Sequence, residues 1–142
     1  MIKVFLDANV LFAAAYSQKG GSFEIINLAK ENKVKVYTSR LAIKEAEKNL
    51  RDKSTDEAID RFYNIFNELD INLIQIDSLN AKKKFGELTG EKDAPILAAA
   101  LKSNSDFLIT LDRKHLLNIH KKLGDLKIVT PGTFIEQYNE SK

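Results

Sequence analysis

Three aspartates in the sequence stand directly beside apolar segments of strand or helix length. Asp7 ends the apolar run at the start of the chain, Asp112 follows a second such run, and Asp93 opens an alanine-rich segment. In open parallel sheets, ligands bind beyond the carboxyl ends of the strands, so Asp7 and Asp112 are candidates for one shared site. Aspartate is also a favoured helix N-cap, because its carboxylate accepts hydrogen bonds from free N–H groups of the first turn. Each aspartate taken alone is compatible with either role.

Glu45 is the fourth acidic candidate, and its place on a predicted helix makes it unusual. A helix is predicted over 41–51, with Ala42 and Leu50 on its apolar stripe. Glu45 and Asn49 fall on the same stripe. A carboxylate within an apolar stripe is costly unless a cation or hydrogen bonds compensate for it. Two interpretations of Glu45 follow, a functional carboxylate in a cleft or a partly exposed ion pair.

The carboxylates of Asp7, Glu45, Asp93 and Asp112 can converge on one cleft if the strands that precede them are parallel. An all-oxygen donor set suits Mg²⁺ or Mn²⁺ and is poorly suited to zinc or copper. The sequence contains no cysteine, and neither of its two histidines has a partner at the spacing of zinc ligands. The predicted cofactor is therefore Mg²⁺ or Mn²⁺, held by these four side chains.

Apolar runs of strand length alternate with segments of helical spacing along the chain. The predicted strands are Ile2 to Leu6, Val34 to Thr38, Leu73 to Ile76, Phe107 to Thr110, and Lys127 to Val129. The predicted helices are Ala8 to Tyr16, Ser22 to Glu31, Leu41 to Arg51, Thr55 to Leu69, Leu79 to Leu88, Ala94 to Ser103, Arg113 to Lys121, and Thr133 to Tyr138.

This alternation predicts an α/β fold, a three-layer α/β/α sandwich with a central, mostly parallel five-stranded sheet, because parallel strands need crossovers and crossovers are usually helical. We find no internal repeat, low-complexity segment or linker, and we expect one domain over residues 1–142.

Composition limits the possible classes of protein. With 142 residues, 44% of them hydrophobic and 30% charged, the chain excludes collagen, coiled-coil and disordered classes. No apolar run approaches the roughly 20 residues that cross a bilayer, and no secretory signal is recognisable, so we expect a cytoplasmic protein without a membrane segment. The net charge of +2 is too small for a uniformly basic surface, and any nucleic-acid binding must use a local patch.

Several short motifs occur in an order that resembles a PIN domain. They are Asp7-Ala8-Asn9-Val10-Leu11, Ser39 six residues before Glu45, Asp93 with Ile96, Thr110-Leu111-Asp112-Arg113, and Val129-Thr130-Pro131 before a last helix. The last of these resembles the carboxyl end of PIN-family toxins, the VapC-like components of bacterial and archaeal toxin–antitoxin systems. The resemblance covers essentially the whole chain. Many relatives carry a further acid after the last one, where this sequence has Arg113, Lys114 and His115.

The resemblance implies a metal-dependent endoribonuclease that hydrolyses RNA phosphodiester bonds. In that role Asp7, Asp93 and Asp112 anchor the metal, and Glu45 holds metal or orients the attacking water. Side chains expected to fix the carboxylate rotamers are Asn9, Ser39, Asn49 and Thr110. Arg113 and Lys114 are candidates for contact with the RNA phosphates.

Partners follow from the resemblance alone. PIN toxins usually form homodimers and are inhibited by an antitoxin whose tail occupies the acidic cleft. Leu11, Phe12 and Tyr16, or alternatively the apolar residues of 62–66, can form a dimer face, but a buried core explains them equally well.

Two other functions compete with the nuclease. One is a PIN-like module that binds RNA or protein without cutting, which the presence of all four acids disfavours. The other is phosphoryl transfer through an aspartyl phosphate at Asp7. Phosphatases of that class need a second Asp where this chain has Asn9, and receiver domains need adjacent acids near the end of the first strand, where residues 1–6 contain none.

Overall fold

The computed structural model describes residues 1–119 and 122–141. Strands and helices alternate along the chain, as the sequence predicts. Their order is β1 (Ile2–Leu6), α1 (Ala8–Tyr16), α2 (Gly21–Lys30), β2 (Val34–Ser39), α3 (Arg40–Lys53), α4 (Asp56–Glu68), β3 (Asn72–Ile74), α5 (Ser78–Thr89), α6 (Ala94–Lys102), β4 (Phe107–Ile109), β5 (Lys127–Val129) and α7 (Pro131–Glu140).

The five strands form one sheet in the order β3-β2-β1-β4-β5. Every neighbouring pair is parallel, with Val4 opposite Val36 on one side of β1 and opposite Phe107 on the other. The predicted α/β fold with a parallel five-stranded sheet is therefore confirmed. The chain leaves β1 toward β2 and later returns to β4 on the opposite side, so the sheet reverses its winding between β1 and β4.

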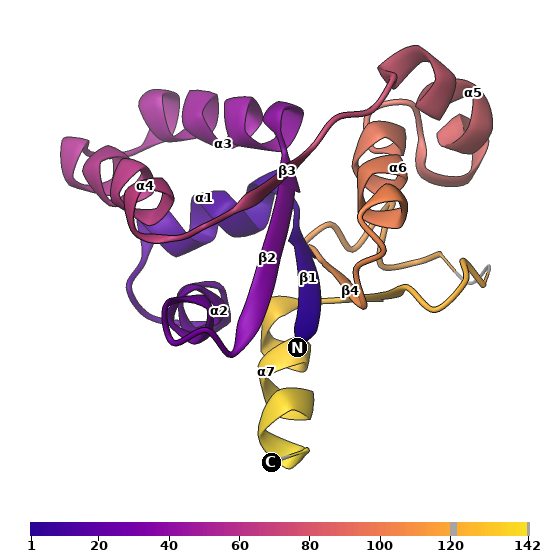
Figure 1. Ribbon diagram of the computed structural model, residues 1–142. Helices are drawn as coiled ribbons and strands as arrows, with labels where there is room; N and C mark the ends of the chain where they lie inside the picture. Colours follow the sequence, from indigo (N-terminus) through magenta and orange to yellow (C-terminus); the bar gives the residue numbers. More distant parts are fainter. Residues whose placement is uncertain (120–121, 142) are drawn as a thin grey trace.

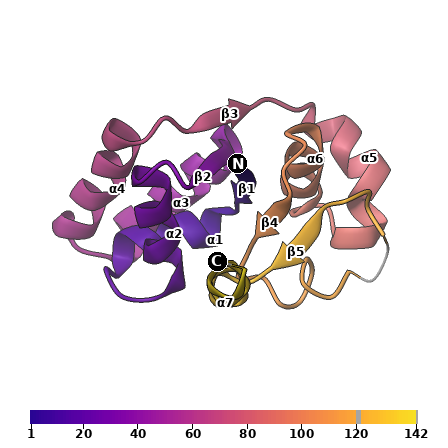
Figure 2. The same cartoon turned by 60° about the horizontal axis from the view of Figure 1, so that its bottom comes forward.

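Helices cover both faces of this sheet. Helices α1 to α4 lie on one side together with α7, whereas α5 and α6 lie on the other, as Figure 1 and the rotated view in Figure 2 both show. This division follows from the winding, because right-handed crossovers that run in opposite directions along a sheet lie on opposite faces.

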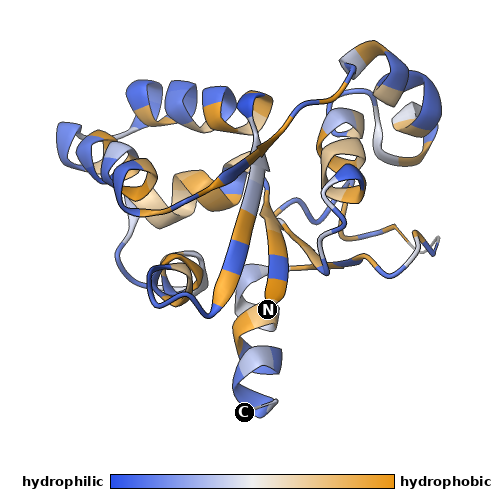
Figure 3. Cartoon of the chain, viewed as in Figure 1, coloured by the Kyte–Doolittle hydropathy of each residue, from blue (hydrophilic) through white to orange (hydrophobic). Residues whose placement is uncertain are grey.

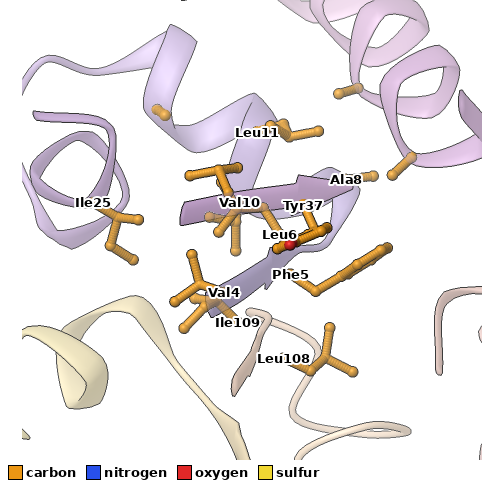
Figure 4. Packing of buried hydrophobic residues seen from close by; sticks show 14 of the residues in the cluster. Val4, Phe5, Leu6, Ala8, Val10, Leu11, Ile25, Tyr37, Leu108 and Ile109 are labelled. Carbon is orange, nitrogen blue, oxygen red and sulfur yellow. The ribbon is translucent and has the colours of Figure 1, made fainter. Parts of the chain in front are cut away.

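Strand β1 is buried on both faces and explains the uninterrupted apolar run at the start of the sequence. Val4, Phe5 and Leu6 are fully buried, and Leu108 and Ile109 of the neighbouring β4 are buried beside them (Figure 4). Apolar residues turn inward on the surrounding helices and polar ones outward (Figure 3). Because β1 is hydrogen-bonded to a neighbouring strand on each side, it fixes the position of the residue that follows it, Asp7.

The predicted helix Arg113 to Lys121 is wrong over its described part. Residues 113–118 form a series of turns, and residues 120–121 lie outside the described residues. The N–H groups of Lys114 and His115 both donate to a carboxylate oxygen of Asp112, at 3.1 and 3.0 Å, which starts a turn instead of a regular helix. Leu116 is nevertheless fully buried, which explains the helix-like apolar spacing of this segment.

None of the helices in the described part of the chain is long and apolar enough to cross a lipid bilayer.

Candidate active site

Asp7 stands at the junction of β1 and α1, where it caps the helix and faces the end of the sheet. Its carboxylate accepts a hydrogen bond from the Ala8 N–H at 2.7 Å and another from the Thr110 hydroxyl at 2.7 Å. The residue is only 4% exposed. Burial raises the pKa of Asp7 to about 6; the hydrogen bonds from Thr110 and Ala8 oppose this shift, and the charges of Glu45 and Asp112 add to it.

Thr110 joins the carboxyl ends of β1 and β4. Besides donating to Asp7, its hydroxyl oxygen accepts the N–H of Asp112 at 3.0 Å. Asn9 reinforces this link, because its amide oxygen accepts the N–H of Leu111 at 3.0 Å and its amide nitrogen donates to Asp7 at 3.4 Å. The hydrogen bonds of Asn9 and Thr110 therefore connect Asp7 to the segment that carries Asp112 across the gap between the two strands.

Glu45 reaches the same place from α3. Ser39 caps this helix by accepting the Ala42 N–H at 3.2 Å, so Ser39 orients the helix that carries Glu45. Ala42 and Leu50 are buried against the core, whereas Glu45 sits at the edge of that stripe with its side chain 34% exposed. It pairs with the ammonium group of Lys92 at 3.4 Å. Glu45 is thus a partly exposed ion pair that also lines a cavity, and its function there stays a prediction.

Asp93 lies on the loop between α5 and α6. Gly90 ends α5 with φ +85° and ψ 152°, a conformation that only glycine adopts readily, and the loop then turns back toward the sheet. Asp93 occupies the N-cap position of α6 but makes no capping hydrogen bond with its side chain, so the cap interpretation is wrong for this aspartate. Partial burial, together with a shared proton and charge repulsion from Asp112, raises the pKa of Asp93 to about 7.

All four carboxylates line one cavity of about 430 Å³ at the carboxyl edge of the sheet. Its position is the point where the winding reverses between β1 and β4, the usual location of ligand sites in open parallel sheets. The complete lining consists of Asp7, Ala8, Asn9, Glu45, Asn49, Thr89, Gly90, Glu91, Lys92, Asp93, Asp112 and His115.

A sequence model of the PIN domain matches residues 3–114, a span that contains all four acids. The chain belongs to the PIN domain family. No curated protein matches the sequence.

Two solved structures share the architecture of this PIN domain. VapBC2 from Rickettsia felis, bound to a DNA fragment from their promoter, has a TM-score of 0.62 and 16% identity, covering 89% of this chain and 98% of that chain. PAE2754 from Pyrobaculum aerophilum has a TM-score of 0.61 and 18% identity, covering 97% of this chain and 96% of that chain. At these identities the likeness concerns the fold.

The cavity of this PIN domain has the chemistry of a site for a hard divalent cation. Its potential ligands are carboxylate oxygens, and burial, together with the charges of neighbouring acids, keeps the pKa values of Asp7 and Asp93 above those of free carboxylates. Within residues 1–119 and 122–141, no group of three or more Asp, Glu or His side chains is arranged so that it could hold a metal ion. Mg²⁺ does not need such a set, because it usually keeps several waters and contacts only one or two carboxylates. The donor set therefore fits the predicted cation.

The supporting and substrate-binding residues divide into three groups. Asn9, Thr110 and Asn49 lie at the carboxylates or in the lining of the cavity, and Ser39 acts only through the cap of α3. Arg113 and Lys114 are exposed beside Asp112 but do not line the cavity, so their contact with RNA remains a prediction.

The residues of the lining to which sequence reasoning gave no role are Ala8, Thr89, Gly90, Glu91 and His115. The signal for two of them is local, since Glu91 lies two residues before Asp93 and Gly90, just before it, is a residue typical of a turn. His115 enters the cavity only because the turn at Asp112 replaces a helix.

Proposed function

We propose that this PIN domain is a divalent-metal-dependent endoribonuclease that hydrolyses RNA phosphodiester bonds. The observation that carries the proposal is the convergence of Asp7, Glu45, Asp93 and Asp112 from separate elements on one cavity at the switch point of the sheet. Neither capping nor surface ion pairing explains why Asp93 and Asp112, which come from separate segments of the chain, line the same cavity.

The protein groups have distinct tasks in this reaction. Asp7, Asp93 and Asp112 would hold the cation directly or through water, and Glu45, which is paired with the exposed Lys92, would hold metal or orient the attacking water. The chemistry that Mg²⁺ or Mn²⁺ supplies is positive charge beside the scissile phosphate and a lowered pKa for a nearby water. Thr110 and Asn9 restrict the carboxylate of Asp7 to one orientation, which reduces the reorganisation needed during the reaction.

We infer that the enzyme is the toxin of a toxin–antitoxin pair that acts in the cytoplasm, with an antitoxin protein and a second copy of the chain as partners. Membership of the PIN family and the structural likeness to VapBC2, which was solved on promoter DNA, support this inference. Several of the residues that the sequence suggested for a dimer face are buried inside the chain. Leu11, Phe62 and Ile65 belong to the core, and Tyr16 remains exposed at the end of α1.

The test of the nuclease is cleavage of single-stranded RNA in Mn²⁺, Mg²⁺ or EDTA by the native chain, Asp7→Asn and Asp93→Asn. We expect both variants to lose about a hundredfold or more in rate, as in other sites that lose a charge-stabilising group. Asp60→Asn, on the exposed face of α4, is the matched control and should cleave like the native chain.

The same experiment separates the competing functions. Equal cleavage by all four proteins would identify a contaminating nuclease and overturn the proposal. RNA binding without cleavage under any metal condition would instead indicate a binding module.

A further inference from the structure

A second hollow, also of about 430 Å³, adjoins the acidic cavity between α3, α5 and the start of α6. We call it the lysine groove and define it by Leu41, Lys44, Lys48, Lys82, Lys92 and Pro95. Glu45 and Lys92 line both this groove and the acidic cavity, so the two hollows are adjacent. One end of a ligand that lies in the groove is therefore next to the carboxylates.

The charge of the groove is opposite to that of the cavity beside it. Its lysines come from three separate parts of the chain, α3, α5 and the loop before α6, and Glu45 is the one acidic residue in its lining. Within the described residues, Lys44, Lys48 and Lys82 form no ion pair. Cations that gather around a concave surface without acidic partners favour an anionic ligand that spans them.

Part of the lining of the groove is apolar. Leu41 is 46% exposed, although it belongs to a helix whose other leucine, Leu50, is buried, and Pro95 of α6, which is itself largely buried, also contributes to the lining. Proteins that bind single-stranded nucleic acid combine a cationic groove for the phosphates with an apolar surface for the bases. The bases of a duplex are paired and stacked with one another, so they are not available to contact such an apolar surface.

We propose that the lysine groove binds the unpaired RNA segment next to the bond that is cut, with phosphates on the lysines and a base against Leu41 and Pro95. This inference rests on the proposed nuclease function, because it assigns the RNA chain a path into that site. The enzyme is accordingly specific for single strands at this position.

Lys92 connects the two hollows. Its side chain is 82% exposed, and its contact with Glu45 at 3.4 Å is a surface ion pair of small net stability. If Glu45 were to bind a cation or a water in the cavity, the ammonium group of Lys92 would be available to a phosphate. Lys92 is thus a positioning residue at the point where the RNA passes from the groove to the acids.

The test compares RNA binding by two double variants in EDTA, where no cleavage occurs. Lys48→Ala/Lys82→Ala removes one lysine of the groove from α3 and one from α5. The matched control, Lys53→Ala/Lys83→Ala, removes exposed lysines of the same two helices that lie outside the groove. Fluorescence anisotropy of a short single-stranded RNA, and of a duplex of the same sequence, gives the Kd and its salt dependence.

We expect the groove variant to bind the single strand about 25-fold more weakly at about 0.1 M salt and to lower the salt slope by about 1.4, because each phosphate contact releases about 0.7 of a counterion. The control should bind like the native chain. Leu41→Ser should weaken binding while leaving the salt slope unchanged, since it removes an apolar contact and no charge.

Three outcomes would overturn the groove proposal: equal binding by the two double variants, equal affinity of the native chain for duplex and single strand, or loss of a dimer in sedimentation without loss of RNA binding. The last would identify the groove as a contact between copies of the chain. A native chain that binds the single strand through these lysines but never cleaves it with Mn²⁺ would refute the nuclease and leave the groove intact.

Discussion

At the scale of single residues, the Thr110 hydroxyl group connects Asp7 to Asp112. Its hydroxyl group donates to the buried oxygen of Asp7 at 2.7 Å, and the same oxygen accepts the Asp112 N–H at 3.0 Å. The hydrogen bond favours the charged form of Asp7, and thereby opposes the effect of burial on its pKa. Thr110 therefore determines both where Asp7 points and how readily it is ionised.

Thr110→Val replaces the hydroxyl group with a methyl group of similar size. We expect the pKa of Asp7 to rise above 6 and the free energy of unfolding to fall by about 1–3 kcal/mol, because a buried acceptor and a buried donor lose their partner. Affinity for Mn²⁺ should fall by about 10–100-fold, as when other groups that orient metal ligands are removed. Chemical denaturation and isothermal titration with Mn²⁺ measure the two effects.

Thr38→Val is the control for that substitution. Thr38 is also fully buried, and its hydroxyl donates to the Leu6 carbonyl at 2.8 Å, next to the site but without contact to a carboxylate. It should lose comparable stability and keep the native affinity for Mn²⁺. If the two variants bind Mn²⁺ equally well, the Thr110 hydroxyl stabilises the fold and has no part in the metal site.

At the scale of elements, the loop from α5 to α6 is the part of the site that depends most on backbone conformation. The Gly90 carbonyl accepts both the Thr89 hydroxyl at 2.7 Å and the Ala94 N–H at 3.2 Å, while its N–H closes the last turn of α5. These bonds require the φ of +85° that Gly90 adopts. A side chain at this position must shift the loop, and with it Asp93.

Gly90→Ala should destabilise the protein by about 1–3 kcal/mol and also reduce cleavage and Mn²⁺ affinity, because the strained loop carries Asp93. Gly20→Ala is a suitable comparison. Gly20 has φ +103° and ψ 176°, the same kind of glycine-only conformation, but it precedes α2 and does not line the cavity. It should lose stability alone, as measured by thermal unfolding beside the RNA cleavage assay. Equal cleavage by the two variants would mean that Asp93 tolerates a displaced loop.

The elements themselves were largely predictable from local pattern. The segments Ile2–Leu6 and Ala8–Tyr16 have the predicted bounds, because a continuous apolar run followed by an aspartate cap leaves little choice. The segment after Asp112 was not predictable by spacing. In that segment the Asp112 carboxylate accepts hydrogen bonds from two N–H groups, which forms a turn. The buried Leu116 nevertheless gives the sequence an apolar spacing like that of a helix.

The site was predictable to the extent that it depends on the ends of strands. Asp7 and Asp112 lie at neighbouring carboxyl ends, which the βα alternation implies once β1 and β4 pair. The lysine groove was not predictable, because Lys48 and Lys82 are far apart in sequence and each resembles an ordinary exposed lysine of a helix. They line one groove because the tertiary fold places α3 and α5 on its two sides, which no local pattern encodes.

At the scale of the whole molecule, the fold brings four acids together at the cost of stability. The folded pKa values of Asp7 and Asp93, about 6 and about 7, lie above the value of about 4 for an unfolded chain. Between about pH 4 and pH 7 the folded state therefore binds more protons than the unfolded state, and these two groups make the free energy of unfolding fall as pH rises. The loss is complete above pH 7 and absent below about pH 4.

A divalent cation should reverse this loss, because it binds the ionised acids of the folded chain and replaces the protons. In EDTA, we expect the melting temperature to fall from about pH 5 to about pH 8, and to fall less for Asp93→Asn, which lacks one of the two raised carboxylates. Mn²⁺ at about a hundredfold excess over its Kd should restore about 2.7 kcal/mol to the native chain at pH 8 and less to Asp93→Asn. Asp60→Asn, with an exposed acid removed from α4, should respond like the native chain. A native chain that melts at the same temperature in Mn²⁺, Mg²⁺ and EDTA across this pH range would show that these carboxylates bind protons but no divalent cation. That result would contradict a metal-dependent mechanism.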